Sequence, residues 1–203
     1  MVLIDKKKLR KKQFELVDRS LSKQYILLLL KGKAIEGKTK LMKELFFISK
    51  NIAELEKELE FEADNYGPSS EVITKYCEDL SNEGFIKLNK KGSKNIYKID
   101  KLGNDYLKQS KSNLDLDLVD DIKELFDGLT YNETLALTYF TFPEITNGSS
   151  VKSKIMDKRV ELALNLYKKD KISLEKASEI AGLSYKKFLE LIQENNIVVE
   201  LIY

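Results

Sequence analysis

The segment from residue 159 to 196 constrains the fold most, because it carries the start and stop signals of three short helices in close succession. Apolar residues recur in it at helical spacing. Ser173 and Ser184 are typical helix N-caps, and Gly182 is typical of the tight turn between two helices. Helices are predicted at 159–169, 174–181 and 184–194. This is the order of a helix-turn-helix, in a domain expected to span residues 151–203.

The start of the last predicted helix is the first candidate site. In a helix-turn-helix, the N-terminal residues of the second helix face the major groove of DNA. Here these residues are Ser184, Tyr185, Lys186 and Lys187. Two lysines at a helix start oppose the helix dipole, which is easier to understand if a DNA phosphate is their neighbour. The alternative is a packed helical hairpin with solvated lysines.

A second module is predicted at residues 20–110, where three amphipathic helices precede a β-hairpin. The helices are expected at 21–30, 36–50 and 71–83, with a charged helix before residue 62 and a further helix at 101–110. The hairpin strands are expected at 85–88 and 96–99, around a basic tip. Helix, helix, helix, hairpin is the order of a winged helix.

The tip of this predicted wing is the second candidate site. Lys90, Lys91 and Lys94 flank a glycine there, where they could reach the phosphate backbone or a minor groove of DNA. A solvated turn is the alternative interpretation. We therefore count the three lysines as candidate DNA contacts.

The third helix of the predicted winged helix argues against DNA contact at that point. Its charged residues are Glu71, Lys75, Glu78, Asp79 and Glu83, four acidic against one basic, a net charge of −3. DNA phosphates would be repelled there. We expect this helix to contact protein or to mediate dimerisation, and we expect DNA contacts from the wing, the basic N-terminus and the C-terminal module.

The complete predicted fold is mainly α with a small β-hairpin wing, a winged helix followed by a C-terminal helix-turn-helix. The domains are expected to be a basic N-terminal segment at 1–19, the winged helix at 20–110, a linker and helical connector at 111–150, and the helix-turn-helix at 151–203. Residues 1–23 carry eight basic and three acidic side chains, a local charge of +5 in a chain whose net charge is +2.

Composition excludes much enzymology. The chain has no histidine and one cysteine, Cys77, so a single chain can build neither a His/Cys zinc site nor a histidine-based triad. We expect no enzyme activity, no catalytic residue, no cofactor and no bound metal. Acidic residues cluster at Asp115, Asp117, Asp120 and Asp121, and we interpret them as a helix start rather than a cation site.

The single cysteine and the absence of any apolar run of about 18 residues predict a cytoplasmic protein with no membrane partner.

Residues 32–39, GKAIEGKT, match the phosphate-loop pattern G-x-x-x-x-G-K-[ST]. That loop needs a strand before it and a parallel sheet around it, and the sequence predicts neither. Gly32 and Gly37 are therefore interpreted as breaks between helices, with a nucleotide-binding loop as a remote alternative.

The C-terminal sequence RVELALNLYKKDKISLEKASEIAGLSYKKFLELIQENNIVV resembles a family of small prokaryotic, often archaeal, helix-turn-helix proteins regarded as antitoxins. The shared pattern is an ALxLY helix, then K-I-S-L-x-K-A, A-G-x-S and a FLxLL helix. The resemblance implies DNA-binding autoregulation and pairing with a toxin. It places Ser184, Tyr185 and Lys186 at the base-facing positions.

A second resemblance spans roughly residues 20–150. GKTKLMKELFFISK, followed by FEADNYGPSSEVITKYCEDLSNEGFI, is similar to uncharacterised prokaryotic winged-helix proteins with a YGPxS turn. These are distantly similar to the Panacea antitoxin domain. In them the G-K-T triplet begins the second helix, which explains the phosphate-loop pattern without a nucleotide.

These observations predict a DNA-binding transcriptional regulator, with autoregulation of a toxin–antitoxin operon as one setting for it. The expected partners are double-stranded DNA, a second copy of the chain in a homodimer, and a toxin or other protein. The apolar residues 197–203 are expected to form a strand that pairs between subunits or against the wing. The alternative is a protein–protein interaction adaptor, or an antitoxin-like module, without DNA binding.

Overall fold

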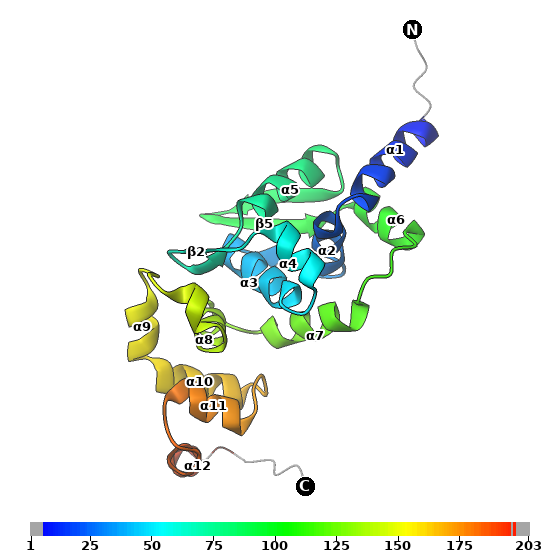
Figure 1. The fold of residues 1–203 in the computed structure, drawn as a ribbon. Helices are drawn as coiled ribbons and strands as arrows, with labels where there is room; N and C mark the ends of the chain where they lie inside the picture. The colour runs from blue at the N-terminus through cyan, green and yellow to red at the C-terminus, as the bar shows by residue number, and fades with distance from the viewer. Residues whose placement is uncertain (1–5, 196, 198–203) are drawn as a thin grey trace. The chain divides into compact units, whose positions relative to one another are not determined.

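The computed structural model describes residues 6–195 and 197 (Figure 1). The chain is mainly helical with small antiparallel β-structure, as the sequence predicted. It divides into two compact units. The first contains the described residues up to Glu62 together with Ser69–Glu124, and the second contains Ala63–Pro68 and the described residues from Leu125 onward.

The first unit carries a three-stranded sheet and its helices. Its elements are α1 (Lys6–Asp18), α2 (Leu21–Leu29), β1 (Ile35–Glu36), α3 (Lys38–Ser49), α4 (Ala53–Leu59), α5 (Glu71–Asn82), β4 (Ile86–Lys91), β5 (Lys94–Ile99), α6 (Lys101–Gln109) and α7 (Leu116–Phe126). Serine caps fix two of the helix starts. The Ser20 hydroxyl accepts from the Lys23 N–H at α2, and the Ser70 hydroxyl accepts from the Ile73 N–H at α5.

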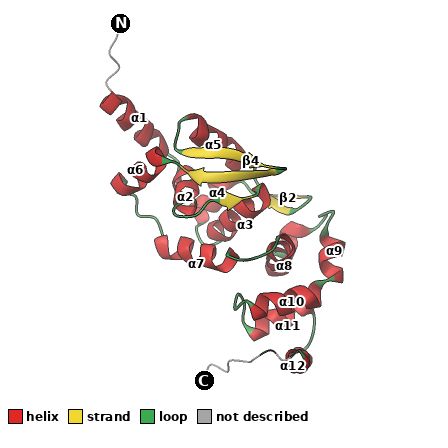
Figure 2. Cartoon of the chain, turned by 180° about the vertical axis from the view of Figure 1, so that it is seen from behind, coloured by secondary structure: helices red, strands yellow, loops and turns green. Residues whose placement is uncertain are grey.

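The sheet has the strand order β1-β5-β4, and all its pairs are antiparallel. Tyr97 of β5 lies between Ile35 of β1 and Leu88 of β4, and Ile86 pairs with Ile99. Helix α5 packs against β4 (Figure 2). The side chains of Ile86, Tyr97 and Ile99 are buried, so one face of this small sheet contributes to the core of the unit.

Two predictions for this unit were wrong in detail. The helix expected at 36–50 begins only at Lys38, because residues 35–36 form the edge strand β1. The hairpin strands are longer than expected and enclose only Gly92 and Ser93, since the ladder continues to the pair Lys91 and Lys94. A two-residue strand and an extended polar ladder both lack the apolar alternation that reveals strands in a sequence.

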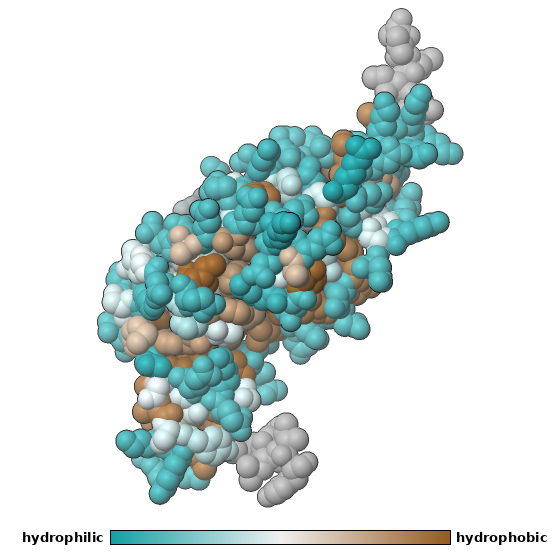
Figure 3. Space-filling view, viewed as in Figure 1, coloured by the Kyte–Doolittle hydropathy of each residue, from teal (hydrophilic) through white to brown (hydrophobic). Residues whose placement is uncertain are grey.

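Helix α1 was not predicted, because its sequence is dominated by lysine. It is held by Phe14, whose ring packs edge-on against Tyr106 at 5.3 Å between centroids and lies 6.1 Å from Phe85. The Tyr106 hydroxyl donates to Asp18 Oδ1 at 2.7 Å. The surface around α1 is largely hydrophilic (Figure 3), as expected for a helix whose inner face alone contacts the core.

The second unit is built from α8 (Tyr131–Thr141), the 3-10 helix η1 (Pro143–Thr146), α9 (Lys152–Asp157), α10 (Arg159–Lys168), α11 (Leu174–Ala181) and α12 (Tyr185–Glu194). The second unit also includes residues 63–68, which contain most of the two-stranded sheet formed by β2 (Glu62–Asp64) and β3 (Gly67–Ser69). One cluster of buried side chains joins α8, α9 and α10: Leu135, Ala136, Tyr139, Ile155 and Leu162. Helix α9 was not predicted.

A buried carboxylate stabilises the start of α8. Thr130 and Glu133 form a capping box, and Glu133 Oε2 also accepts from Lys169 Nζ at 2.6 Å. Lys169 in turn donates to the Gly128 carbonyl at 2.9 Å. Burial raises the pKa of Glu133, but the hydrogen bonds from Lys169 and Thr130 outweigh burial and hold it below its ordinary value.

This lowered pKa predicts an acid-sensitive contribution to stability. A carboxyl group whose pKa is lower in the folded state stabilises the fold above its unfolded pKa of about 4.3, and this contribution is lost as pH falls through the folded pKa. We expect urea unfolding at pH 7 and at pH 3 to show a smaller difference in unfolding free energy for Glu133→Gln than for the wild type. Equal pH dependence of the two proteins would contradict the assignment.

Candidate nucleic-acid interface

Helices α10, α11 and α12 lie at the residues that the sequence predicted, within one residue at each end. The local signals account for this agreement. The Ser173 hydroxyl accepts from the Lys176 N–H at 3.2 Å, and the Ser184 hydroxyl accepts from the Lys187 N–H at 3.4 Å. Gly182 ends α11 in the left-handed region at φ 69°, and the Leu183 N–H bonds the Ser178 carbonyl at 3.1 Å, as in a Schellman turn.

Arg159 fixes the turn between α11 and α12, a role that the sequence did not reveal. Its Nε donates to the Ile180 carbonyl at 2.7 Å, and its Nη2 donates to the Glu179 carbonyl at 3.1 Å. The guanidinium also lies over the Phe140 ring, 4.9 Å from the centroid. It caps the last turn of α11, and its positive charge interacts favourably with the negative end of the helix dipole. The Arg159 side chain therefore stabilises the fold of this unit, and we do not count it among the candidate DNA contacts.

Gly182→Ala is expected to destabilise the second unit by about 2–3 kcal/mol. An added Cβ would lie 2.6 Å from the Arg159 guanidinium carbon, at a backbone φ that alanine adopts only under strain. Gly148→Ala is the matched control, because Gly148 also has a positive φ of 88° but nothing within 4 Å of an added Cβ. Urea unfolding should give a clearly smaller loss for the control, and equal losses would refute the packing role of Arg159.

The predicted base-facing residues lie together on the open side of α12. Ser184, Lys186 and Lys187 are exposed, and Tyr185 is 44% exposed. The opposite side of the helix is buried through Phe188, whose ring packs edge-on near Tyr167 at 6.4 Å between centroids. Within the described residues, Lys186 and Lys187 make no ion pair. Two positive charges therefore stand uncompensated beside the N–H groups of the first helical turn.

The other candidate lysines lie in the first unit, on the β4–β5 ladder. Lys90, Lys91 and Lys94 are all exposed. Lys91 Nζ of β4 forms an ion pair with Glu36 Oε1 of the edge strand β1 at 3.4 Å, across the central strand β5. In the part of the chain that the structure describes, Lys90 and Lys94 have no ion-pair partner. Lys90 and Lys94 are consequently open to an anionic partner.

Helix α5 presents the acidic surface that its sequence predicted. Its buried side is formed by Ile73, Cys77 and Leu80, and Glu71 and Glu78 are exposed.

Burial, reinforced by the charge of Glu78, raises the pKa of the Cys77 thiol to about 12. This thiol is a packed core residue and is protonated at neutral pH.

The two weaker motifs do not form the sites that their patterns match. Helix α2, not a strand, precedes Gly32, and β1 pairs antiparallel with β5, so a phosphate loop lacks its parallel sheet. Asp115 Oδ1 accepts from the Leu118 N–H at 3.0 Å, which makes it a cap of α7. Over residues 6–195 and 197 there is no cluster of acidic, histidine or cysteine side chains suited to a metal ion.

Comparison with known proteins bears on the C-terminal part alone. Residues 144–201 match UPF0175, an uncharacterised protein family. The match contains α9 to α12 and is consistent with the antitoxin-like C-terminal module inferred from the sequence. Neither the curated proteins nor the solved structures gave a match to this chain. None of the helices in the described residues has the length and apolar character required to cross a bilayer.

Proposed function

We propose that this protein is a sequence-specific DNA-binding transcriptional regulator whose α11 and α12 form a helix-turn-helix. The observation that carries the proposal is the exposed, unpaired lysine pair at the start of α12. Lys186 and Lys187 oppose the helix dipole, so their position costs stability unless an anion neutralises them. A DNA phosphate satisfies both lysines and the N–H groups of the first turn.

The first unit supports this proposal as a winged helix. Its element order, with α2, β1, α3, α4 and α5 before the hairpin β4–β5, and its sheet order β1-β5-β4 support this interpretation. Lys90 and Lys94 on the wing would add phosphate contacts. Helix α5, with its exposed glutamates, is the element of this unit least suited to DNA.

Regulation of its own operon, shared with a toxin, is the biological setting that we propose. The antitoxin-like resemblance and the UPF0175 match at residues 144–201 support it. Helix-turn-helix regulators bind as dimers to half-sites about one DNA turn apart, so we propose a homodimer. The strand expected at 197–203 as a dimer contact lies, apart from Ile197, outside the described residues.

Selection from a pool of random DNA duplexes tests the function. The full-length protein is expected to enrich a single motif, repeated as two half-sites spaced by one helical turn. Enrichment of half-sites without that spacing would contradict the dimer, and enrichment of no motif would contradict sequence-specific regulation.

The acidic surface of α5 favours one alternative function, a protein–protein interaction adaptor. Glu71 and Glu78 are exposed, and Asp79 is paired with Lys23 at 3.4 Å. Such a surface suits a basic protein partner and repels DNA. An adaptor predicts no duplex binding at any salt concentration, whereas a regulator predicts binding that weakens as salt is raised.

A further inference from the structure

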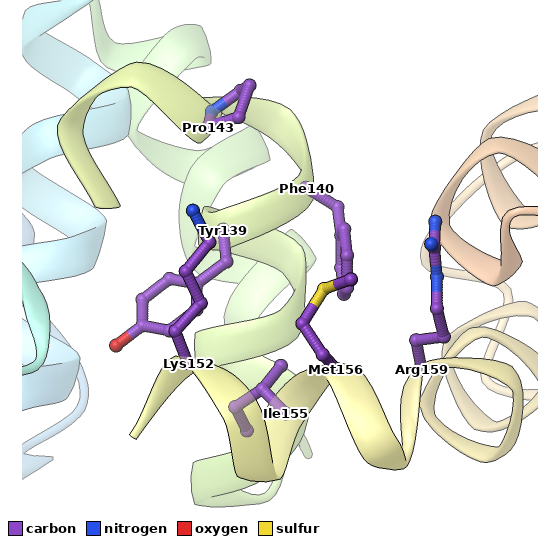
Figure 4. A pocket seen from close by; sticks show the side chains of 7 residues that line it. All are labelled: Tyr139, Phe140, Pro143, Lys152, Ile155, Met156 and Arg159. Atoms are coloured by element: carbon purple, nitrogen blue, oxygen red, sulfur yellow. The ribbon is translucent and has the colours of Figure 1, made fainter. Parts of the chain in front are cut away.

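The second unit contains a pocket of about 280 Å³ between α8, η1, α9 and the start of α10 (Figure 4). Its walls are the side chains of Tyr139, Phe140, Pro143, Ile155 and Met156. The Tyr139 hydroxyl is already hydrogen-bonded to Ser149 Oγ at 2.7 Å, so this residue offers its ring to the pocket. Met156 is 39% exposed, which places a polarizable thioether at an open edge.

Two cations complete the lining, Lys152 and Arg159. In Figure 4, Lys152 runs beside Tyr139 and Arg159 lies on the far side of Phe140 and Met156. Lys152 Nζ donates to the neutral Asn147 Oδ1 at 3.0 Å, and Arg159 donates to backbone carbonyls. Among the described residues, neither cation has a carboxylate within ion-pair distance. The pocket therefore joins apolar walls to positive charge that no side chain neutralises.

We propose that this pocket binds a small aromatic carboxylate, and that its occupancy weakens DNA binding. Apolar walls with a small number of polar or charged groups are the usual composition of a small-molecule site. An apolar cavity of about 150 Å³ accommodates benzene, so 280 Å³ suits a ligand of one or two fused rings. The rings would pack against Phe140 and Met156, and the carboxylate would bind Arg159, with the Lys152 side chain reaching toward it from the Tyr139 side of the pocket.

Arg159 connects the pocket to the turn before α12. The same guanidinium that lines the pocket bonds the Ile180 and Glu179 carbonyls and packs against Gly182. A ligand carboxylate competes for it because it can accept a bidentate pair of hydrogen bonds in which both partners are charged, whereas the carbonyls are neutral acceptors. Ligand binding thereby loosens the cap of α11 and the turn that positions Lys186 and Lys187. This regulatory step rests on the proposed DNA binding, and ligand binding does not.

The ligand site is tested first, without DNA, by calorimetric titration of the full chain with 2-naphthoate and with the neutral 2-naphthalenemethanol. We expect the wild type to bind 2-naphthoate and to bind the alcohol at least about tenfold more weakly. We expect the same loss of affinity for 2-naphthoate in Lys152→Met, a variant that keeps the apolar stem of the side chain but removes its charge. Lys154→Met is the matched control, an exposed lysine of α9 that does not line the pocket. Absence of naphthoate binding, or equal affinity for both compounds or both variants, overturns the site.

The coupling is tested by the amide NMR signals of Ile180 and Gly182, which we expect to shift when 2-naphthoate is added. Unshifted amides at saturation overturn the coupling. The affinity for duplex DNA should fall several-fold in saturating 2-naphthoate, and the affinity for 2-naphthoate should fall by the same factor in saturating DNA. An unchanged DNA affinity also overturns the regulation. A chain that binds naphthoate and shifts these amides but binds no DNA refutes the proposed function while leaving the site and its coupling supported.

Discussion

Replacing Lys186 and Lys187 together by glutamate should weaken binding to duplex DNA by about 100-fold or more, because each reversal removes a phosphate contact and adds a repulsion. The two side chains are exposed and lack ion pairs within the described residues, so no internal salt bridge is broken. Acidic residues in the first turn of α12 also favour the helix dipole. The variant is therefore expected to remain folded, and its lost affinity reports on the interface. Fluorescence anisotropy with a labelled duplex measures the change.

The matched control is Lys108→Glu combined with Lys111→Glu. It changes the net charge of the chain by the same amount, at two exposed lysines of the first unit that belong to neither candidate site. We expect the control to retain most of its affinity, with the small loss due to its charge alone. If both double variants lost affinity equally, the long-range charge of the protein rather than α12 would dominate binding.

Phe188→Ala should lower the unfolding free energy of the second unit by about 3–5 kcal/mol, the usual loss for truncating a buried aromatic side chain. The Phe188 side chain is fully buried on the inner side of α12, where it packs near Tyr167. Hydrogen exchange of the α12 amides and urea unfolding followed by circular dichroism both measure the loss.

Tyr185→Ala provides the contrast within the same helix turn. Tyr185 is 44% exposed, so its truncation should change the unfolding free energy by only about 0.5 kcal/mol. It should nevertheless weaken DNA binding if Tyr185 faces the major groove. If Tyr185→Ala destabilised the unit as much as Phe188→Ala, the rotational setting of α12 described above would be wrong.

The parts of the fold that the sequence predicted are those with local signals. Ser173, Gly182 and Ser184 fix the ends of α11 and α12 through hydrogen bonds within a few residues, so the sequence alone located both helices. The Ser20 and Ser70 hydroxyls cap α2 and α5 through the same kind of local hydrogen bond. In these segments, local preference and tertiary packing agree.

The parts that were missed depend on residues far apart in the chain. Helix α1 is held by the packing of Phe14 against Phe85 and Tyr106. The lysine-rich sequence of α1 does not by itself predict this contact. The role of Arg159 depends on the carbonyl groups of α11, about twenty residues away. The sequence predicted the candidate lysines as exposed cations. Only the structure shows that Lys91 forms an ion pair with Glu36, whereas Lys90 and Lys94 have no ion pair within the described residues.

The central claim is that α12 reads DNA through Lys186 and Lys187. The most direct measurement is the duplex affinity of the wild type and of the matched variant Lys186→Gln with Lys187→Gln, each determined from low to high salt. The wild type is predicted to bind with an affinity that falls linearly in log–log form as salt rises, and the variant to bind more weakly with a slope reduced by about 2. No duplex binding by the wild type at any salt concentration, or an unchanged slope and affinity in the variant, would contradict the claim.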